Sequence, residues 1–337
     1  MQKLRIIITA GIVAIVVGYL ATTMIIKMQN TQTPLVEARI PQETIDFFNN
    51  LGGGDIGGIF VDDSIDGWDK YEDVDGMCRI EDSLFVIYYS SVDSTVEGIK
   101  ALIALRYARE AVKPLADFMG NYRYPYTVNG RKLPIYLANT EADYSNICQK
   151  LGHGSAPTGT LGLYCWRYSV QGTITDGIII SPKAWQTMEK TLKANSEDVA
   201  LQKTLWHEMN HYVFFTNLDL VKNPVPPLWV SEGCAEYFAD NRARLAYTPG
   251  NPKKYYANCH LYSNEMNGYG SQYDPYWVGL SAFYSFESHH SRARLSSFIR
   301  LSYTQPYAQA VDDALNTDNG LKLWDNEWHS DLENGKF

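Results

Sequence analysis

The chain has 337 residues, of which 45% are hydrophobic and 20% charged, and this balance excludes wholesale disorder. Its formal net charge is −9, which excludes a nucleic-acid partner, because neutralising phosphates requires clustered Lys and Arg side chains. The length is sufficient for two lobes and a sizeable core.

The first predicted element is an uncharged apolar run over residues 6–26, which as a helix would span about 30 Å, the thickness of a bilayer core. Lys3 and Arg5 precede the run and only Lys27 follows it closely. The positive-inside bias therefore predicts a single-pass membrane protein with its soluble domain on the periplasmic or extracellular side. A cleaved signal peptide is the alternative, but its apolar core would be shorter, at about 7–15 residues. We expect residues 1–30 to form an uncleaved anchor.

Residues 31–82 form a predicted linker that ends in an acidic stretch. Within that stretch Asp62, Asp66, Gly67 and Asp73 follow the spacing of a calcium-binding loop. No amphipathic helix flanks these residues, so a solvated acidic loop is the favoured interpretation.

Residues 83–200 alternate between predicted strands and helices and indicate an upper lobe with a small mixed sheet. The predicted helix ends before Pro114, because proline disrupts a helix interior. The predicted segments are strands over Leu84–Tyr89, Leu133–Leu137 and Gly177–Ser181, a helix over Val96–Val112 and a loop over Gly152–Gly162.

Five cysteines lie in the exported part of the chain, where disulfides are permitted. Cys148 and Cys165 are close in sequence and are the first candidates for a bridge. An odd count leaves at least one thiol outside any internal bridge, and sequence alone cannot give the connectivity.

Residues 201–337 are predicted to form a zinc-binding helical lobe, because they contain the string His207-Glu208-Met-Asn-His211. Apolar residues recur around it at helical spacing, namely Leu201, Leu205, Met209, Tyr212 and Val213. On a helix the two histidines lie one turn apart on one side and can bind one Zn²⁺, while Glu208 lies beside the metal. The alternative is a pair of partly buried histidines on a polar helix face. Asn195 and Asp198 are predicted to cap the start of this helix.

A second helix supplies the candidate third ligand. Ser231 is a good N-cap residue, so Glu232 is predicted to open this helix, with Glu236 one turn later on the same face. A catalytic zinc takes three protein ligands and leaves one position open. Otherwise Glu232 would merely compensate the helix dipole and Glu236 would be a solvated acid. Two carboxylates on one face of an otherwise apolar helix favour the metal site.

The string H-E-x-x-H, followed by Trp229-x-x-Glu232-Gly-x-Ala-x-Tyr237, resembles the gluzincin zinc peptidases, and in particular bacterial MA-like peptidase domains with a W-x-S-E-G-x-A-E-Y element. The resemblance implies an α+β, zincin-like two-lobe domain with zinc between a small mixed sheet and a helical C-terminal lobe. It implies His207, His211 and Glu232 as metal ligands, and Glu236 as the carboxylate that orients His207.

In gluzincins a Tyr or His from a later segment often stabilises the oxyanion, and Tyr276 lies in a stretch similar to the tyrosine-bearing helix of that family. Its rivals are Tyr269, Tyr273, His289 and His290. The Gly-x-x-x-Asn element of aminopeptidases is not evident, so that specificity is not carried over.

These features together predict a membrane-anchored zinc peptidase that acts on a peptide or protein substrate, with Glu208 as general base. Two alternatives stay open. One is a zinc amidase acting on cell-wall peptides, because the same chemistry serves any amide. The other is an inactive gluzincin-like binding module, against which the presence of Glu208 argues.

Overall fold

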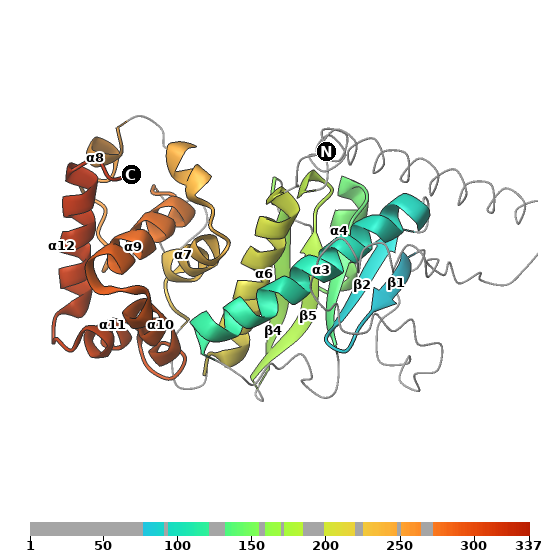
Figure 1. The fold of residues 1–337 in the computed structure, drawn as a ribbon, viewed down its shortest axis with the longest axis horizontal. Coiled ribbons are helices and arrows are strands. Elements are labelled where there is room, and N and C mark those ends of the chain that lie inside the picture. The colour runs from blue at the N-terminus through green and yellow to red at the C-terminus, as the bar shows by residue number, and fades with distance from the viewer. Residues whose placement is uncertain are drawn as a thin grey trace, which may run out of the picture.

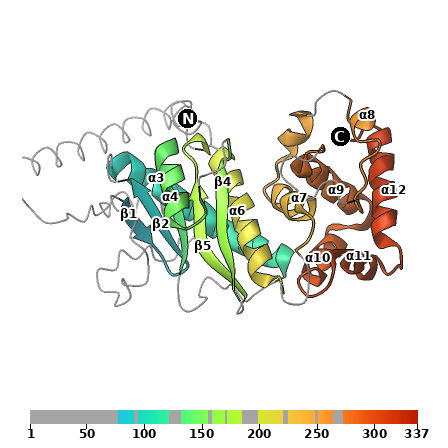
Figure 2. The ribbon, with the colours of Figure 1, turned by 180° about the vertical axis from the view of Figure 1, so that it is seen from behind.

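The computed structural model describes residues 77–90, 94–120, 132–154, 159–169, 172–184, 199–219, 225–247, 251–263 and 272–337. These residues form one five-stranded sheet, nine α-helices and a 3-10 helix. The helices covering the sheet and the C-terminal helices occupy opposite ends of the molecule (Figure 1; Figure 2).

The sheet is mixed, as predicted. Its strands lie in the order β1-β2-β3-β5-β4, with β2, β3 and β5 parallel and the two outer strands antiparallel to their neighbours. The central strands are apolar on both faces, as expected for parallel strands covered on each side. The strands are β1 (Met77–Glu81), β2 (Phe85–Ser90), β3 (Leu133–Leu137), β4 (Gly162–Ser169) and β5 (Gly172–Ile180).

Helices cover both faces of the sheet, and the alternation of side chains along the strands divides the core accordingly. On one face Ile87, Ile135 and Ile178 pack with α3 (Ser94–Met119) and α6 (Val199–Asn217). On the other face Val86, Tyr136 and Ile179 pack with α4 (Glu141–Lys150). The strands predicted over 84–89 and 133–137 are confirmed within a residue or two, whereas α4 and β4 were not predicted.

The remaining helices are clustered around α9, which contacts α7, α10 and α12. Their apolar centre is aromatic, with Trp229, Phe283, Phe286, Phe298 and Trp324 all buried in edge-on or stacked contacts. The elements are α7 (Leu228–Phe238), η3 (Arg242–Tyr247), α8 (Pro252–Tyr255), α9 (Pro275–His290), α10 (Arg292–Leu301), α11 (Tyr307–Leu315) and α12 (Gly320–Glu333).

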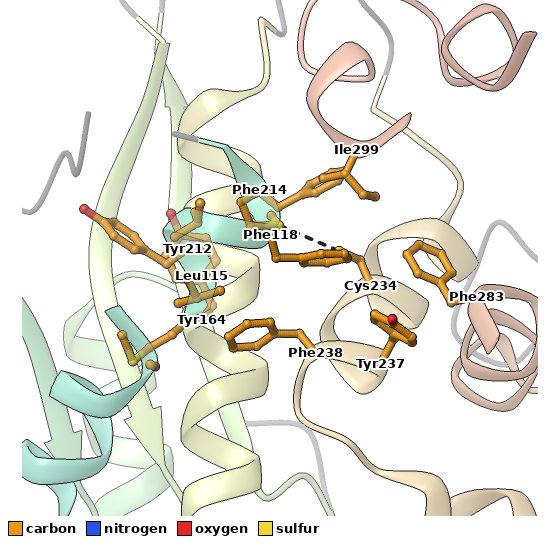
Figure 3. Packing of buried hydrophobic residues seen from close by; sticks show 14 of the residues in the cluster. Leu115, Phe118, Tyr164, Tyr212, Phe214, Cys234, Tyr237, Phe238, Phe283 and Ile299 are labelled. Atoms are coloured by element: carbon orange, nitrogen blue, oxygen red, sulfur yellow. Dashed lines mark hydrogen bonds between the residues drawn. The ribbon is translucent and has the colours of Figure 1, made fainter. Parts of the chain in front are cut away.

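The C-terminal end of α3 joins these helices to the sheet. Figure 3 shows Phe118 of α3 among side chains from α6, α7, α9 and α10. The prediction that a helix ends before Pro114 is wrong, because α3 continues through this proline to Met119. A proline in a helix interior costs about 3 kcal/mol, and the complete or near-complete burial of Leu115, Phe118 and Met119 offsets that cost.

The expected Cys148–Cys165 bridge is not formed, and all five cysteines described are free thiols. Cys148 of α4 and Cys165 of β4 lie in the same apolar cluster and behave as small hydrophobic residues. Burial raises the pKa of Cys148 to about 11 and raises that of Cys165 further. Both thiols are therefore neutral at physiological pH.

Several N-terminal predictions lie outside the described residues, namely the apolar anchor over 6–26, the calcium-like loop and the linker up to residue 76. The last residues assigned to the linker are described and include strand β1, Met77–Glu81. No helix in the part of the chain that the structure describes is long and apolar enough to cross a bilayer. The boundary placed after residue 200 stays a prediction; it falls inside the first turn of α6.

Candidate metal centre

Helix α6 holds the two motif histidines. Its apolar stripe is confirmed, because Leu201, Leu205 and Met209 are fully buried against the rest of the core. The helix packs against β4, β5 and α3, and another part of its surface packs against α7. His207 and His211 lie on that side, nearly buried, with their Nε2 atoms 3.0 Å apart. The capping residues predicted before this helix lie outside the described residues.

Helix α7 brings Glu232 to the histidines. Its Oε2 atom lies 3.2 Å from the Nε2 atom of His207 and 3.2 Å from that of His211. The prediction that Ser231 caps this helix is wrong. The helix begins at Leu228 after Pro227, and the Ser231 hydroxyl donates to the carbonyl of Leu228 within the first turn. Proline, whose φ suits the entry to a helix, moves the start one turn earlier.

The three side chains fit a zinc ion. In a tetrahedral site with metal–ligand bonds of about 2.0–2.1 Å, neighbouring ligand atoms are about 3.3–3.4 Å apart. Here the three edges measure 3.0, 3.2 and 3.2 Å. Two imidazoles and one carboxylate are also the donor set of a catalytic zinc site with an open fourth position. The group can therefore hold a metal ion with shifts of only a few tenths of an ångström.

Strong electrostatic coupling accompanies this convergence. Burial alone lowers the pKa of His207, but hydrogen bonds with Glu232 and Glu236 raise it well above the usual histidine value. Burial alone raises the pKa of Glu232, but the neighbouring His211 and His207 lower it well below the usual range. The site thus favours ionised carboxylates next to a positive charge. A divalent cation bound between these side chains would supply such a charge.

Glu236 lies on the far side of His207 from Glu232. Its Oε1 atom is 3.4 Å from Nδ1 of His207 and 3.4 Å from the Arg244 guanidinium of η3. Glu236 is only 3% exposed, so it is not a solvated acid. Burial alone raises its pKa, but the hydrogen bond with His207 and the charge of Arg244 lower it overall. This position suits the predicted orienting role.

Glu208 points from α6 toward β4. A Cβ atom on Gly162 would lie 2.8 Å from the Oε1 atom of Glu208, so a larger residue there would force this side chain to move. The Tyr164 backbone hydrogen-bonds to Glu208. Burial raises the pKa of Glu208, an effect that His207 and His211 oppose. A buried carboxylate with a raised pKa beside a metal site suits proton transfer.

Tyr276 lies in the first turn of α9, with its ring centroid 6.2 Å from that of His207 and its plane tilted by only 21°. Of its rivals, Tyr273 is buried among Tyr255 and Tyr256, while Tyr269 lies outside the described residues. His289 and His290 pair instead with the α12 carboxylates Asp331 and Glu327, at the other end of α9.

Sequence reasoning missed Arg244, whose guanidinium carbon lies 4.5 Å from the centre of the Tyr276 ring. It also contacts Glu236 and, at 3.7 Å, Asp274 at the start of α9. The Arg244 guanidinium thus contacts both Glu236, the partner of His207, and the ring of Tyr276. No motif spacing marks Arg244, because the 3-10 turn of η3 that aims it is set by tertiary contacts.

Sequence reasoning also missed an aromatic pair next to His211. Trp166 of β4 and Phe215 of α6 are stacked with ring centroids 4.9 Å apart, and both are only partly buried. Phe215 follows His211 by one helical turn, with ring centroids 6.0 Å apart. The run Leu163–Tyr168 was a recognisable strand signal, but a sequence cannot show that its Trp lies beside the metal centre.

Comparisons with known proteins give matches only among solved structures. No family model and no curated protein sequence matches this chain. An M1 zinc metallopeptidase from Deinococcus radiodurans aligns with 71% of this chain at 16% identity and a TM-score of 0.35. A mutant of the Deinococcus radiodurans M1 zinc metallopeptidase aligns with 72% of this chain at 17% identity and a TM-score of 0.33. A mutant of a two-domain M1 zinc metallopeptidase bound to L-arginine aligns with 71% at 17% identity and a TM-score of 0.32.

This chain spans about half the length of the matched structures, which it covers to 47%, 48% and 47% respectively. TM-scores this low do not establish a shared function.

Proposed function

We propose that this protein is a zinc-dependent peptidase of gluzincin type, in which His207, His211 and Glu232 hold the metal. The observation that carries this proposal is the buried triangle of two imidazole nitrogens and one carboxylate oxygen with edges of 3.0–3.2 Å. A buried glutamate next to this triangle supplies the acid–base group that hydrolysis requires. The combination favours catalysis over a purely structural metal site, which has no use for such a base.

Zinc, when bound, acts as a Lewis acid that polarises a carbonyl and makes water acidic near neutral pH. Glu208 accepts a proton from the attacking water on a carboxylate oxygen and later delivers it to the departing amine. Its raised pKa suits both steps, because the carboxyl group then exchanges protons more easily near neutral pH. The hydrogen bond from the Tyr164 backbone holds the carboxylate on the side of β4.

The Tyr276 hydroxyl is our candidate for the second donor to the developing oxyanion. Its ring lies over His207, and Arg244 covers the ring at 4.5 Å. A cation at this distance stabilises the position of an aromatic ring. We assign Tyr276 to oxyanion stabilisation and Arg244 to positioning of that tyrosine.

A peptide substrate is favoured over other amides by the strand next to Glu208. Among the described strands, β4 lies at the edge of the sheet and begins at Gly162, in contact with the Glu208 carboxylate. An edge strand can pair with an extended peptide through backbone hydrogen bonds, which would carry the scissile bond past the base. The partly buried Trp166 and Phe215 would contact large apolar side chains of such a peptide.

Two alternatives use the same centre. A zinc amidase acting on cell-wall peptides would share every residue above and differ only in substrate. An inactive gluzincin-like binding module would hold the metal without turnover. The anchor predicted over residues 6–26 would place any of these activities on the periplasmic or extracellular side of a membrane.

The test replaces Glu208 with Gln. We expect Glu208→Gln to lower peptide hydrolysis by about 10²–10⁴-fold, because general acid–base catalysis contributes about that much. Its zinc content should equal that of the wild type, whereas His207→Ala and Glu232→Ala should each lose one zinc per chain. The measurement pairs metal analysis with cleavage of a peptide library.

The matched control is Glu110→Gln, which makes the same chemical change at an exposed position of α3 and should leave both quantities unchanged. Wild-type turnover in Glu208→Gln would refute the assignment of the base. An absence of turnover in a zinc-loaded wild type on peptide and cell-wall substrates would favour the binding module.

A further inference from the structure

A second group of metal-ligating side chains lies apart from this centre, where the turn after α8 meets α12. His260 of the turn, together with Asp325 and His329 of α12, offer ligand atoms that all lie within 4.8 Å of one another. Asp325 and His329 are one helical turn apart, the spacing at which two side chains on a helix can share one ligand.

The carboxylate at the centre of this group is buried, while the imidazoles reach the surface. The Asp325 side chain is 2% exposed, against 39% for His260 and 22% for His329. Its Oδ2 atom lies 2.9 Å from Nδ1 of His260, and its Oδ1 atom accepts a hydrogen bond of 2.7 Å from the Leu261 backbone. His329 directs its Nε2 atom to the Cys259 carbonyl at 2.9 Å, with Asp325 Oδ1 4.0 Å away.

The charge balance of Asp325 distinguishes it from the other buried aspartate of α12. Asp331 pairs with the Lys336 ammonium as well as with His289, so its charge is matched by a permanent cation. Among the described residues, the ion-pair partners of Asp325 are two histidines, and no Lys or Arg supplies it with a permanent cation. A buried carboxylate without a full countercharge is costly, and a divalent cation between it and two imidazoles would supply that charge.

We propose that His260, Asp325 and His329 form a second divalent-metal site that takes zinc, with a stabilising role. Two imidazoles and a carboxylate are zinc donors, and the partial exposure of both rings leaves room for water to complete the coordination. To bind the metal beside Asp325, the His329 ring would turn from the Cys259 carbonyl toward the carboxylate.

The site fastens the turn to the C-terminal helix. At the start of this turn the Tyr256 ring stacks on Trp277 of α9, with centroids 4.4 Å and planes 4° apart. Trp277 adjoins Tyr276 in sequence, so the metal would stabilise the support of the proposed oxyanion donor without touching the first centre. The inference itself does not depend on the proposed peptidase activity.

Zinc stoichiometry tests this site. The full chain is stripped with a chelator, reloaded with Zn²⁺, freed of excess metal, and analysed for metal per chain. We expect two zinc ions in the wild type and one in each of His260→Ala and His329→Ala. His329→Gln, which keeps most of the side-chain volume and a hydrogen-bond donor, should also bind one. His207→Ala should bind one, retained at the second site.

The matched control is His153→Ala in the sheet-bearing half. His153 has the same 2.9 Å contact with an aspartate, Asp176, and a 20% exposed side chain, but among the described residues it belongs to no group of three metal-ligating side chains. It should keep two zinc ions.

A wild type with one zinc, lost only in His207→Ala, would overturn the second site and leave the peptidase proposal intact. A wild type with one zinc that is lost in His260→Ala but kept in His207→Ala would support the second site and overturn the proposed catalytic centre. Thermal unfolding adds an independent readout: zinc should raise the Tm of His207→Ala but not of the His207→Ala/His329→Ala double variant. Equal shifts in both would also overturn the second site.

Discussion

At the scale of single residues, the two candidate histidine ligands differ in how firmly they are held. His207 is bound at both nitrogens, with Nε2 near Glu232 and Nδ1 near Glu236. The Nδ1 atom of His211 is buried and has no hydrogen-bond partner among the described residues. The orientation of the His207 ring is therefore fixed by carboxylates on both of its nitrogens, whereas the His211 ring has a protein partner at Nε2 alone among the described residues.

The raised pKa of His207 predicts how zinc affinity depends on pH. A protonated imidazole cannot bind zinc, so affinity should fall as the pH drops below this raised pKa. Glu236→Gln removes one of the charges that raise it, so the fall should begin at a lower pH. The variant should also bind zinc about 10–100-fold more weakly at its plateau, because the partner that orients His207 is weakened. Zinc titrations in metal-buffered solutions between pH 5 and 9 measure both effects.

The same pair stabilises the metal-free fold within a defined pH window. The raised pKa of His207 gives a contribution that is complete below the ordinary histidine pKa and is lost as the pH rises through the raised value. The lowered pKa of Glu236 gives a contribution to folding stability that is present above the ordinary glutamate pKa. This contribution is lost as the pH falls through the lowered value. An unchanged pH profile of zinc binding in Glu236→Gln would contradict this coupling.

At the scale of elements, the positions of Glu232 and Glu236 depend on how closely α7 approaches α9. The two helices cross at Gly233 and Gly279, where a Cβ atom on Gly233 would lie 2.5 Å from the Cα atom of Gly279. Such contact is possible only between glycines, since backbone atoms cannot give way as a side chain does. The crossing sets the distance between the α7 carboxylates and Tyr276 at the start of α9.

Gly233→Ala should therefore separate the two helices. We expect it to destabilise the fold by about 1–3 kcal/mol, the usual cost of overpacking, despite the higher helix propensity of alanine. Turnover should fall more than zinc content, because His207, His211 and Glu232 can move together while Tyr276 moves away. Chemical denaturation, metal analysis and kcat for one peptide substrate measure the three quantities. A more stable, fully active Gly233→Ala protein would show that the helices do not meet this closely.

At the scale of the whole molecule, the sheet and the C-terminal helices are joined through the end of α3. The Phe118 ring contacts Tyr237 and Phe238 of α7, with centroids 5.6 and 6.3 Å apart. Its backbone carbonyl accepts a hydrogen bond from Ser296 of α10, and the adjacent Asp117 carbonyl accepts one from Arg300. Since the histidines lie on α6 and the glutamates on α7, this junction holds the two halves of the metal centre together.

Phe118→Ala should weaken this junction. Truncating a buried phenylalanine typically costs about 3–5 kcal/mol, and the loss should lower zinc affinity because it acts between α6 and α7. Lys113→Ala on the exposed side of the same helix is the control, and should change stability by less than about 0.5 kcal/mol. Thermal unfolding and zinc titration provide the measurements. A Phe118→Ala protein with wild-type stability and zinc affinity would show that the end of α3 is not what holds α6 and α7 together.

The sequence by itself determined the local features that depend on neighbouring residues. The spacing of His207 and His211 placed both on one side of α6, because a helix repeats every 3.6 residues. The same rule placed Glu232 and Glu236 on one face of α7, even though the helix starts four residues earlier than a cap at Ser231 predicts. Strand positions over 85–90 and 133–137 followed from apolar and β-branched runs, which need no long-range information.

Only the tertiary structure decided the features that arise from contacts between distant segments. The continuation of α3 through Pro114 depends on packing of its last turn against α7 and α10, which outweighs local helix propensity. Arg244 reaches Glu236 and Tyr276 because η3 turns it there, and no periodic pattern encodes that turn. The sequence thus predicted the candidate metal ligands, while the fold decided what lies around them, because motif spacing is local and packing is not.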